Sequence, residues 1–435
     1  ANLQIRNIQA SSALDMLVAI ESLGLTSRGS GADNIRNITG SPTAGIDRNE
    51  LIDTRPFCLE MHHYILNHRE LYGLPRKFNI AFNGGGAISV LEETNDIGFS
   101  AINVVDGVDI VPGVYFRLFL GGATGHGDFA FDAKVLVRPE DCISLAGAIL
   151  RVFIHLGDRS NRQKARLKYV IEELGHEKFL NEVENEWGKP LLRPSTIITD
   201  ELRSADSHGH IGVTPQKQIG LNYIGIQTPV GRIMSDQLSK IADLSEEFGS
   251  GDIRLTVWQN LIISDIPDRH VDACIKAIKS IGLDTEASAI RRGLVACTGN
   301  AGCKFAAANT KADALKIADY IDARFKINTP INIHLTGCKN SCAQHYIGDI
   351  GLIGVKIDVQ GKFEEGYNIF IGGGFGIKAK LAKEYAKSIP ADKIVTVIEK
   401  LIQCWVKNKA HEDEPFYEFA NRYDIDELKK IASLI

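Results

Sequence analysis

The second half of this 435-residue chain repeats the order of motifs found in its first half. The triplet Asp96–Gly98 returns as Asp349–Gly351, and the run Gly113–Gly122 returns as Gly366–Gly373. A repeat that stays in order over several blocks means that one folding unit is used twice. We therefore predict an internally duplicated α+β fold, in which each half contains a small unit followed by a larger one.

The first copy of the small unit is expected to be incomplete. Residues Asn2–Ile5 match Asn260–Ile263 and are predicted to form a strand, and the helix ending at Ser22 matches one ending at Ser280. The chain opens at Ala1 without an initiator methionine. We therefore expect that a preceding segment is missing. A region rich in Pro, Gly, Ser and His, near residues 187–215, is expected to link the two halves.

Four cysteines of the second half form two close pairs that are far apart in sequence. They are Cys297, Cys303, Cys338 and Cys342. Four thiolates on two loops can hold a [4Fe–4S] cluster or a zinc ion. Neither pair has the Cys-x2-Cys spacing of a zinc knuckle, so the spacing favours the cluster modestly.

The repeat predicts which residues stand opposite these cysteines in the first half. Cys338 and Cys342 fall opposite Gly85 and Ser89. Cys297 and Cys303 fall opposite Ile38 and Ala44. Only the second half is therefore expected to bind the metal.

Composition and the remaining cysteines narrow the class of protein. The chain is 44% apolar and 24% charged with a net charge of −5, which argues against a nucleic-acid binder, and it contains no apolar run as long as a membrane span.

The other four cysteines lie in helical, apolar contexts and are expected to be reduced core residues. They are Cys58, Cys142, Cys274 and Cys404.

The residues around the second pair resemble a known signature. Thr336-Gly337-Cys338-Lys339-Asn340-Ser341-Cys342, followed by Asp349-Ile350-Gly351-Leu352, is similar to the siroheme/[4Fe–4S] motif of the nitrite and sulfite reductase family. The resemblance implies two small ferredoxin-like half-domains and two larger α/β siroheme/Fe–S domains, related by a pseudo-two-fold axis. The expected segments are a truncated half-domain at 1–26, a siroheme domain at 27–186, a linker and half-domain at 187–286, and a siroheme/[4Fe–4S] domain at 287–435.

Within that family the resemblance assigns substrate contacts to the first half. Arg36 and Lys77 match cations that line the face of siroheme where the oxyanion binds, and a further family arginine would lie before Ala1. Asn79 matches the position where nitrite reductases carry asparagine and sulfite reductases carry lysine. The alternative is that these are solvated surface cations and an ordinary strand residue.

Siroheme carries many carboxylates and needs cations to hold it. Several basic residues of the first half are candidates, and Asn340 inside the cysteine loop is a candidate for tuning the cofactors by hydrogen bonding. The candidates are Arg6, Arg76, Arg162, Lys164, Arg166, Lys168 and Asn340. A predicted helix with Lys378, Lys380, Lys383 and Lys387 is a candidate docking surface for an acidic electron donor.

The resemblance implies a reaction and its partners. It predicts the six-electron reduction of nitrite to ammonium by a cytoplasmic monomer, with Cys342 bridging the [4Fe–4S] cluster to siroheme and ferredoxin as electron donor. Three alternatives stay open. They are sulfite reduction on the same framework, a precorrin-3B synthase-like enzyme, and a zinc or iron–sulfur protein without siroheme.

Metal analysis separates these alternatives. The purified chain is expected to contain about five iron atoms, since a four-iron cluster and one siroheme account for them. Elemental analysis combined with the absorption spectrum of siroheme checks this. A chain that contains zinc alone would contradict it.

Overall fold

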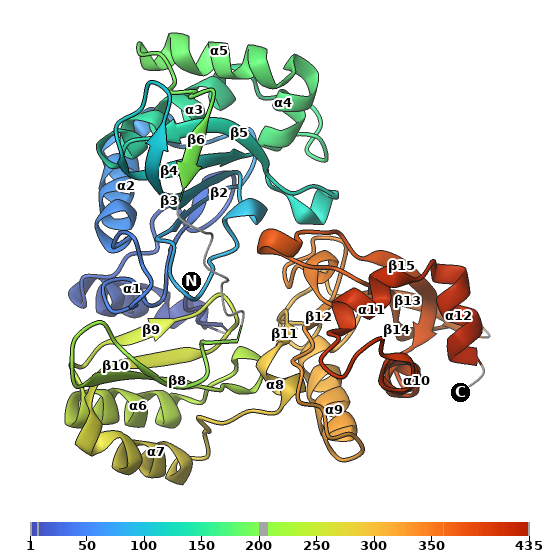
Figure 1. The fold of residues 1–435 in the computed structure, drawn as a ribbon. Helices are drawn as coiled ribbons and strands as arrows, with labels where there is room; N and C mark the ends of the chain where they lie inside the picture. The colour runs from blue at the N-terminus through green and yellow to red at the C-terminus, as the bar shows by residue number, and fades with distance from the viewer. Residues whose placement is uncertain (1, 7, 200–207, 360, 434–435) are drawn as a thin grey trace. The chain divides into compact units, whose positions relative to one another are not determined.

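The computed structural model describes residues 2–6, 8–199, 208–359 and 361–433. The chain divides into two compact units (Figure 1). Unit 1 contains Ala1–Ala123 and Asp128–Asp206, and unit 2 contains Thr124–Gly127 and Ser207–Ile435.

Unit 1 is built on one mixed sheet in the order β1-β2-β3-β4-β5, with β6 added alongside β3. Strands β1, β2 and β3 run parallel, and β3, β4 and β5 run antiparallel. The strands are β1 Ile35–Gly40, β2 Phe78–Asn83, β3 Ile97–Gly107, β4 Gly113–Leu120, β5 Phe131–Val137 and β6 Ile197–Thr199. The helices are α1 Ala13–Ser22, α2 Arg55–Asn67, α3 Cys142–Leu156, α4 Leu167–Leu174 and α5 His176–Trp187.

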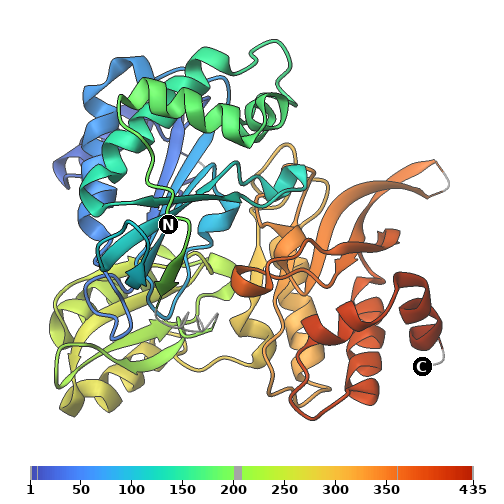
Figure 2. The ribbon, with the colours of Figure 1, turned by 45° about the horizontal axis from the view of Figure 1, so that its top comes forward.

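The larger part of unit 2 repeats this topology. Its sheet runs β11-β12-β13-β14-β15, parallel over the first three strands and antiparallel over the rest. Figure 2 shows β13 and β14 as a long curved hairpin. The strands are β11 Leu294–Ala296, β12 Ile333–Thr336, β13 Ile350–Val359, β14 Lys362–Ile371 and β15 Lys383–Pro390. The helices are α8 Ala289–Arg292, α9 Thr310–Asp322, α10 Ile394–Asn408, α11 Phe416–Arg422 and α12 Ile425–Ser433.

The predicted duplication is confirmed by equivalent hydrogen bonds in the two sheets. The amide of Asn79 in β2 donates to the Asp96 carboxylate at 2.9 Å. The amide of Asn332, just before β12, donates to the Asp349 carboxylate at 2.7 Å. Asp96 immediately precedes β3, and Asp349 immediately precedes β13. In each copy, this hydrogen bond therefore connects the start of the second strand of the sheet to the start of the third.

The smaller part of unit 2 is an antiparallel sheet in the order β7-β8-β10-β9 with α6 and α7 on one face (Figure 1). Ile262, Ile263 and Ile266 of β10 are fully buried, and Ile263 and Ile266 pack in the same core as residues of both helices. The elements are β7 Gly212–Pro215, β8 Leu221–Ile226, β9 Ile253–Leu255, β10 Leu261–Pro267, α6 Ser235–Phe248 and α7 Val271–Ser280.

Within the described residues before β1, the first copy of this small unit is represented by helix α1. Helices α1 and α7 are both ten residues long and end at the matched positions Ser22 and Ser280. The predicted strand at Asn2–Ile5 is wrong, because these residues pair with no strand in the described part of the chain. Helix α1 buries none of its side chains.

The four cysteines outside the metal motif lie in α2, α3, α7 and α10, as predicted. Three of them are buried, whereas Cys58 is half-buried, and none forms a disulfide. Burial raises the pKa of Cys58 to about 12 and that of Cys274 to about 11, so both thiols are protonated at neutral pH. They are packing residues rather than nucleophiles.

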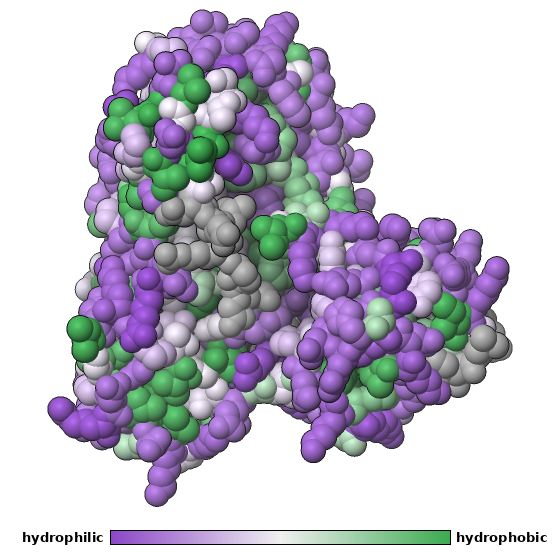
Figure 3. Space-filling view, in the orientation of Figure 1, coloured by the Kyte–Doolittle hydropathy of each residue, from purple (hydrophilic) through white to green (hydrophobic). Residues whose placement is uncertain are grey.

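Hydrophilic side chains dominate the face of the molecule drawn in Figure 3. Among the described residues, none of the helices combines the length and the apolar character needed to span a bilayer.

We predict that Asp349→Asn reduces the pH dependence of stability. Burial raises the pKa of Asp349 from its ordinary 3.8 to about 6, so ionisation is unfavourable in the folded state. When folding raises the pKa of an acid, the protonated acid stabilises the folded state. This stabilisation is complete below the unfolded pKa and is lost as pH rises through the folded pKa, here between about pH 4 and 6. Urea unfolding across this window should show a steeper decline for the wild type than for the variant. Equal slopes would contradict the assignment.

Candidate functional site

The first cysteine of the metal motif is held against the loop that carries the second pair. Cys297 directly follows β11, and its amide donates to the carbonyl of Leu335 in β12 at 3.0 Å. The amide of Gly337 then donates to the sulfur of Cys297 at 3.1 Å. The hydroxyl of Thr310, the first residue of α9, donates to the Cys297 carbonyl at 2.8 Å. Cys297 is therefore fixed from both sides.

The rest of the first loop also lies against the second. The amide of Ala307 donates to the carbonyl of Gly337 at 2.7 Å, and that of Ala306 donates to the carbonyl of Cys303 at 3.1 Å. Because Gly337 directly precedes Cys338, these bonds bring the two cysteine pairs into neighbouring loops. A side chain at Gly337 would lie 2.6 Å from the Ala306 methyl group, so this close approach needs glycine.

The second loop turns the Cys342 side chain outward. Ser341 and Ala343 are buried on either side, while Cys342 is exposed. Ser341 adopts a left-handed backbone conformation with φ of 50°, and its hydroxyl lies 2.8 Å from Nδ1 of His345. This hydrogen bond holds the serine inward, whereas the neighbouring Cys342 stays exposed.

The donor set of the two loops is four thiols, which suits a [4Fe–4S] cluster. All eight cysteines are free of disulfides. Within the described part of the chain, no three His, Cys, Asp or Glu side chains lie close enough together to hold one metal ion. A zinc ion needs its ligands around a single point, whereas a cluster with iron at several corners accepts thiolates that stand farther apart.

Two buried histidines support the second loop. Burial lowers the pKa of His334 to about 4 and that of His345 to about 3, so both are neutral at physiological pH. Nδ1 of His334 lies 3.2 Å from the carbonyl of Gln344. Neutral imidazoles cannot balance the negative charge of a carboxylate. Their role in this arrangement is to hold the loop.

The strand registers correct one predicted correspondence between the halves. Ile80 pairs with Ile38 and Ile97 just as Ile333 pairs with Leu294 and Ile350. Ile38 is thus equivalent to Leu294.

Counting three residues on from each, the counterpart of Cys297 is Ser41, so the predicted match of Cys297 to Ile38 is wrong. The predicted match of Cys303 to Ala44 lies beyond the paired strands and stays a prediction. The amide of Gly84 donates to the Ser41 hydroxyl at 3.2 Å, in the same way that the amide of Gly337 donates to the Cys297 sulfur. The sequence match failed because it aligned Thr39-Gly40 with Thr298-Gly299. The strand registers show that these two pairs are three positions apart.

The predicted substrate residues lie together at one end of the unit 1 sheet. β1 and β2 are parallel, with Ile35 opposite Phe78 and Asn37 opposite Asn79. The register shifts at Arg36, and Lys77 directly precedes β2, so both cations stand at the start of neighbouring strands. The Arg36 guanidinium also donates to the carbonyl of Ala32 at 2.7 Å.

A buried ion pair supports this end of the sheet. Arg166 donates to the Asp96 carboxylate at 2.8 and 3.1 Å, and the exposed fractions of the two side chains are 5% and 0%. The same carboxylate accepts the amide of Asn79. Arg166 is therefore engaged in holding the backbone at Asn79.

The other predicted siroheme cations fall into two groups. Lys168 is buried and paired with Asp128 and Glu172. Arg76 and Arg162 share Asp33, which Arg162 binds at 2.7 and 3.0 Å, and these hydrogen bonds lower the pKa of Asp33.

Among the described side chains, Nε of Arg76 is a buried donor without a hydrogen-bond partner, which suits it to a further carboxylate. Arg6, Lys164 and Asn340 are exposed, as is Arg162.

The predicted lysine-rich helix is wrong. Lys383 and Lys387 lie on the edge strand β15, and Lys378 ends a short 3-10 helix where it pairs with Glu418 at 3.2 Å. The strand forms because residues 383–390 pair with β14. The lysine spacing resembled one helix face, but cross-strand pairing decided the structure.

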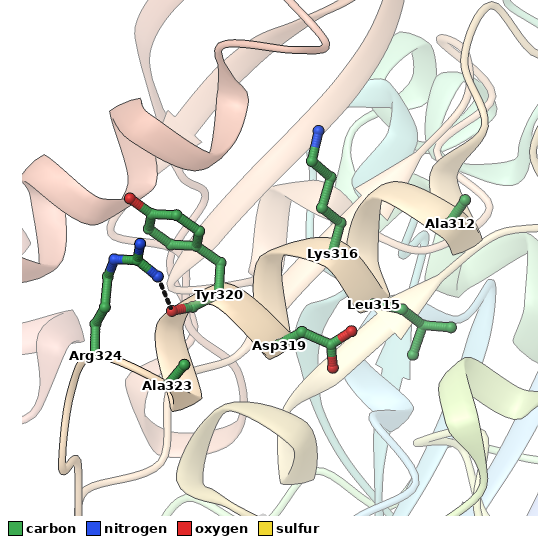
Figure 4. A pocket seen from close by; sticks show the side chains of 7 residues that line it. All are labelled: Ala312, Leu315, Lys316, Asp319, Tyr320, Ala323 and Arg324. Carbon is green, nitrogen blue, oxygen red and sulfur yellow. Dashed lines mark hydrogen bonds between the residues drawn. The ribbon is translucent and has the colours of Figure 1, made fainter.

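A hollow of about 480 Å³ lies elsewhere on unit 2 (Figure 4). All of its lining residues come from α9 and the two residues after it, so it is one face of a helix. The Arg324 guanidinium lies 3.5 Å from the centre of the Tyr320 ring, and the Tyr320 hydroxyl donates to Glu399 at 2.9 Å. None of the predicted site residues lines it.

Comparison with known proteins places these features in one family. The pattern described as "Nitrite and sulphite reductase 4Fe-4S domain" matches residues 31–191 and 288–434, and that described as "Nitrite/Sulfite reductase ferredoxin-like half domain" matches residues 214–281. The chain is 36% identical over 416 residues to a ferredoxin–nitrite reductase of Synechococcus elongatus, covering 92% of this chain and 78% of the relative.

Two further similarities agree. A ferredoxin–nitrite reductase of Leptolyngbya laminosa is 38% identical over 408 residues, with 92% of this chain and 78% of the relative covered. The solved structure of the Mycobacterium tuberculosis NirA protein superimposes with a TM-score of 0.87 at 29% identity, covering 96% of this chain and 76% of that one.

We predict that Arg166→Ala destabilises unit 1 by about 3–5 kcal/mol, because it leaves the Asp96 carboxylate buried without its cation. Arg162→Ala is the matched control, since the Arg162 side chain is 62% exposed and its ion pair is solvated. Urea denaturation of both variants measures the difference. If both variants lose equally little stability, the ion pair of Arg166 does not stabilise the fold.

Proposed function

The chain belongs to the nitrite and sulfite reductase family, and on that premise we propose that it reduces nitrite to ammonium with electrons from ferredoxin. The observation that carries the proposal is the pair of adjacent loops bearing Cys297, Cys303, Cys338 and Cys342. The relatives named ferredoxin–nitrite reductase, which are 33–38% identical over 92% of the chain, support the choice of nitrite.

The cofactors are siroheme and a [4Fe–4S] cluster. When bound, they supply the electron delivery and the iron site at which the nitrogen of nitrite is reduced. The four cysteines would hold the cluster, with Cys342 shared between the two cofactors. The outward orientation of Cys342 between two buried neighbours supports its role as the shared ligand.

Arg36 and Lys77 bind nitrite and stabilise the negative charge that develops on its oxygens. A cation about 4 Å from an anion contributes roughly 4 kcal/mol at an effective dielectric of about 20. Their adjacent places at the start of β1 and β2 support a joint role. Both are also hydrogen-bond donors, so they can orient the ordered water that delivers protons as each oxygen leaves.

Asn79 selects nitrite over sulfite. Sulfite is largely a dianion near neutral pH, whereas nitrite is a monoanion, so a neutral amide at this position favours the smaller charge. The Asp96 carboxylate fixes the backbone of Asn79, which limits how far this residue can move to accommodate another anion.

Siroheme binding is assigned to basic side chains of unit 1. Arg76, with its buried unpartnered Nε, is the strongest of them, and Arg162, Lys164 and Arg6 are further candidates. Arg166 and Lys168 bind acidic side chains of their own unit and are weaker choices. Asn340 is assigned to hydrogen bonding near the cluster. The chain is proposed to act as a cytoplasmic monomer, and the absence of disulfides among the cysteines of the described residues agrees with a reducing compartment.

The substitution Asn79→Lys tests the function and its selectivity together. We expect kcat/KM for nitrite to fall and that for sulfite to rise, because an added cation favours the dianion. Steady-state rates with both anions, using reduced ferredoxin as donor, measure the ratio. Lys77→Met, which removes a cation, should reduce both rates. An unchanged ratio in the Asn79 variant would contradict the charge argument, and sulfite turnover exceeding nitrite turnover in the wild type would favour the sulfite alternative.

A further inference from the structure

The loop that carries Cys303 is largely surrounded by solvent. Between Asn300 and Asn309, the residues Ala301, Gly302, Lys304 and Phe305 are exposed, with the Phe305 side chain 65% accessible. An exposed loop of this kind gains little rigidity from apolar packing and depends on hydrogen bonds for its shape.

One carboxylate binds both arms of this loop. Oε1 of Glu365 accepts a hydrogen bond from Nδ2 of Asn300 at 2.6 Å, and Oε2 accepts one from the amide of Asn309 at 2.9 Å. Asn300 precedes Cys303 and Asn309 follows it. The amide of Asn300 also donates to the carbonyl of Ala308 at 3.0 Å, which closes the base of the loop.

Glu365 itself stands on a rigid support. It lies in β14 opposite Lys356 of β13, and its carbonyl accepts the amide of Ala391 at 3.0 Å. Two residues along the same strand, the buried Tyr367 donates to Asp313 at 2.5 Å, which ties β14 to α9. The carboxylate therefore has a fixed position from which to hold the loop.

We propose that Glu365 is a positioning residue for Cys303. This rests on the proposed function, in which Cys303 is a cluster ligand. By bridging Asn300 and Asn309, the carboxylate keeps the Cys303 loop closed over its side of the cluster. Without it the loop opens more often, and chelators from solvent reach the iron that Cys303 holds. Sequence patterns gave no sign of this role, because Glu365 lies outside both cysteine motifs.

The test compares Glu365→Gln with Glu364→Gln in the cluster-loaded chain. Glutamine keeps the size of the side chain but replaces one acceptor oxygen with an NH2 group that faces a donor. We expect an iron(II) chelator under anaerobic conditions to remove iron roughly tenfold faster from Glu365→Gln than from wild type, since a hydrogen bond to a charged group controls loop opening. Glu364 is exposed on the same strand, and its variant should lose iron at the wild-type rate.

Two further measurements distinguish positioning from a general loss of stability. Asn300→Ala removes one arm, so its effect and that of Glu365→Gln should be less than additive in the double variant. The electron paramagnetic resonance spectrum of the reduced cluster should change in both single variants, while the thermal midpoint of the apoprotein stays the same.

Wild-type chelation rates and spectra in Glu365→Gln, an equal effect of Glu364→Gln, or full additivity with Asn300→Ala would overturn the proposal. If the wild-type chain itself binds no cluster, the proposed function fails first. A cluster-loaded wild type with an unaffected Glu365 variant overturns the positioning role alone.

Discussion

The hydrogen bond from the Gly337 amide to the Cys297 sulfur joins the two loops on which the candidate metal centre depends. It forms because β11 and β12 are parallel and in register, so the loops that follow them leave the sheet side by side. In unit 1 the same amide position, Gly84, donates to the hydroxyl of Ser41. Both copies share the backbone contact, and exchanging oxygen for sulfur turns this loop contact into an iron ligand candidate.

The two copies differ in how they neutralise a matched acid. Asp96 is paired with Arg166, whereas Asp349 accepts hydrogen bonds from the backbone and side chain of Asn332, and burial raises its pKa. In unit 1 the ion pair supports strand β2, which contains Asn79 and directly follows Lys77. Some basic residues between 159 and 168 are therefore exposed to solvent, whereas others are buried in ion pairs with acidic side chains.

Much of the fold could be predicted because the signals were local. The helices containing Cys142 and Cys404 and the Asp-Ile-Gly repeat follow from apolar patterning and turn residues. The failures involved partners distant in sequence. Asn2–Ile5 has the composition of a strand but pairs with no strand in the described part of the chain, and the Lys383–Lys387 segment becomes a strand because β14 lies beside it.

The candidate site shows the same division. The types of its ligands, the soft thiolates and the cations of Arg36 and Lys77, could be read from the sequence because chemistry is a property of the side chain itself. The sequence could not show which cations are available to bind a ligand, since that depends on whether an acid such as Asp96 or Asp33 lies nearby in space. The sequence alone determined the duplication, the cysteine set and the family to which they point. Only the tertiary structure decided that Ser41 stands where Cys297 does and that Glu365 binds both arms of the Cys303 loop, because hydrogen bonds between distant segments exist only after the strands have paired.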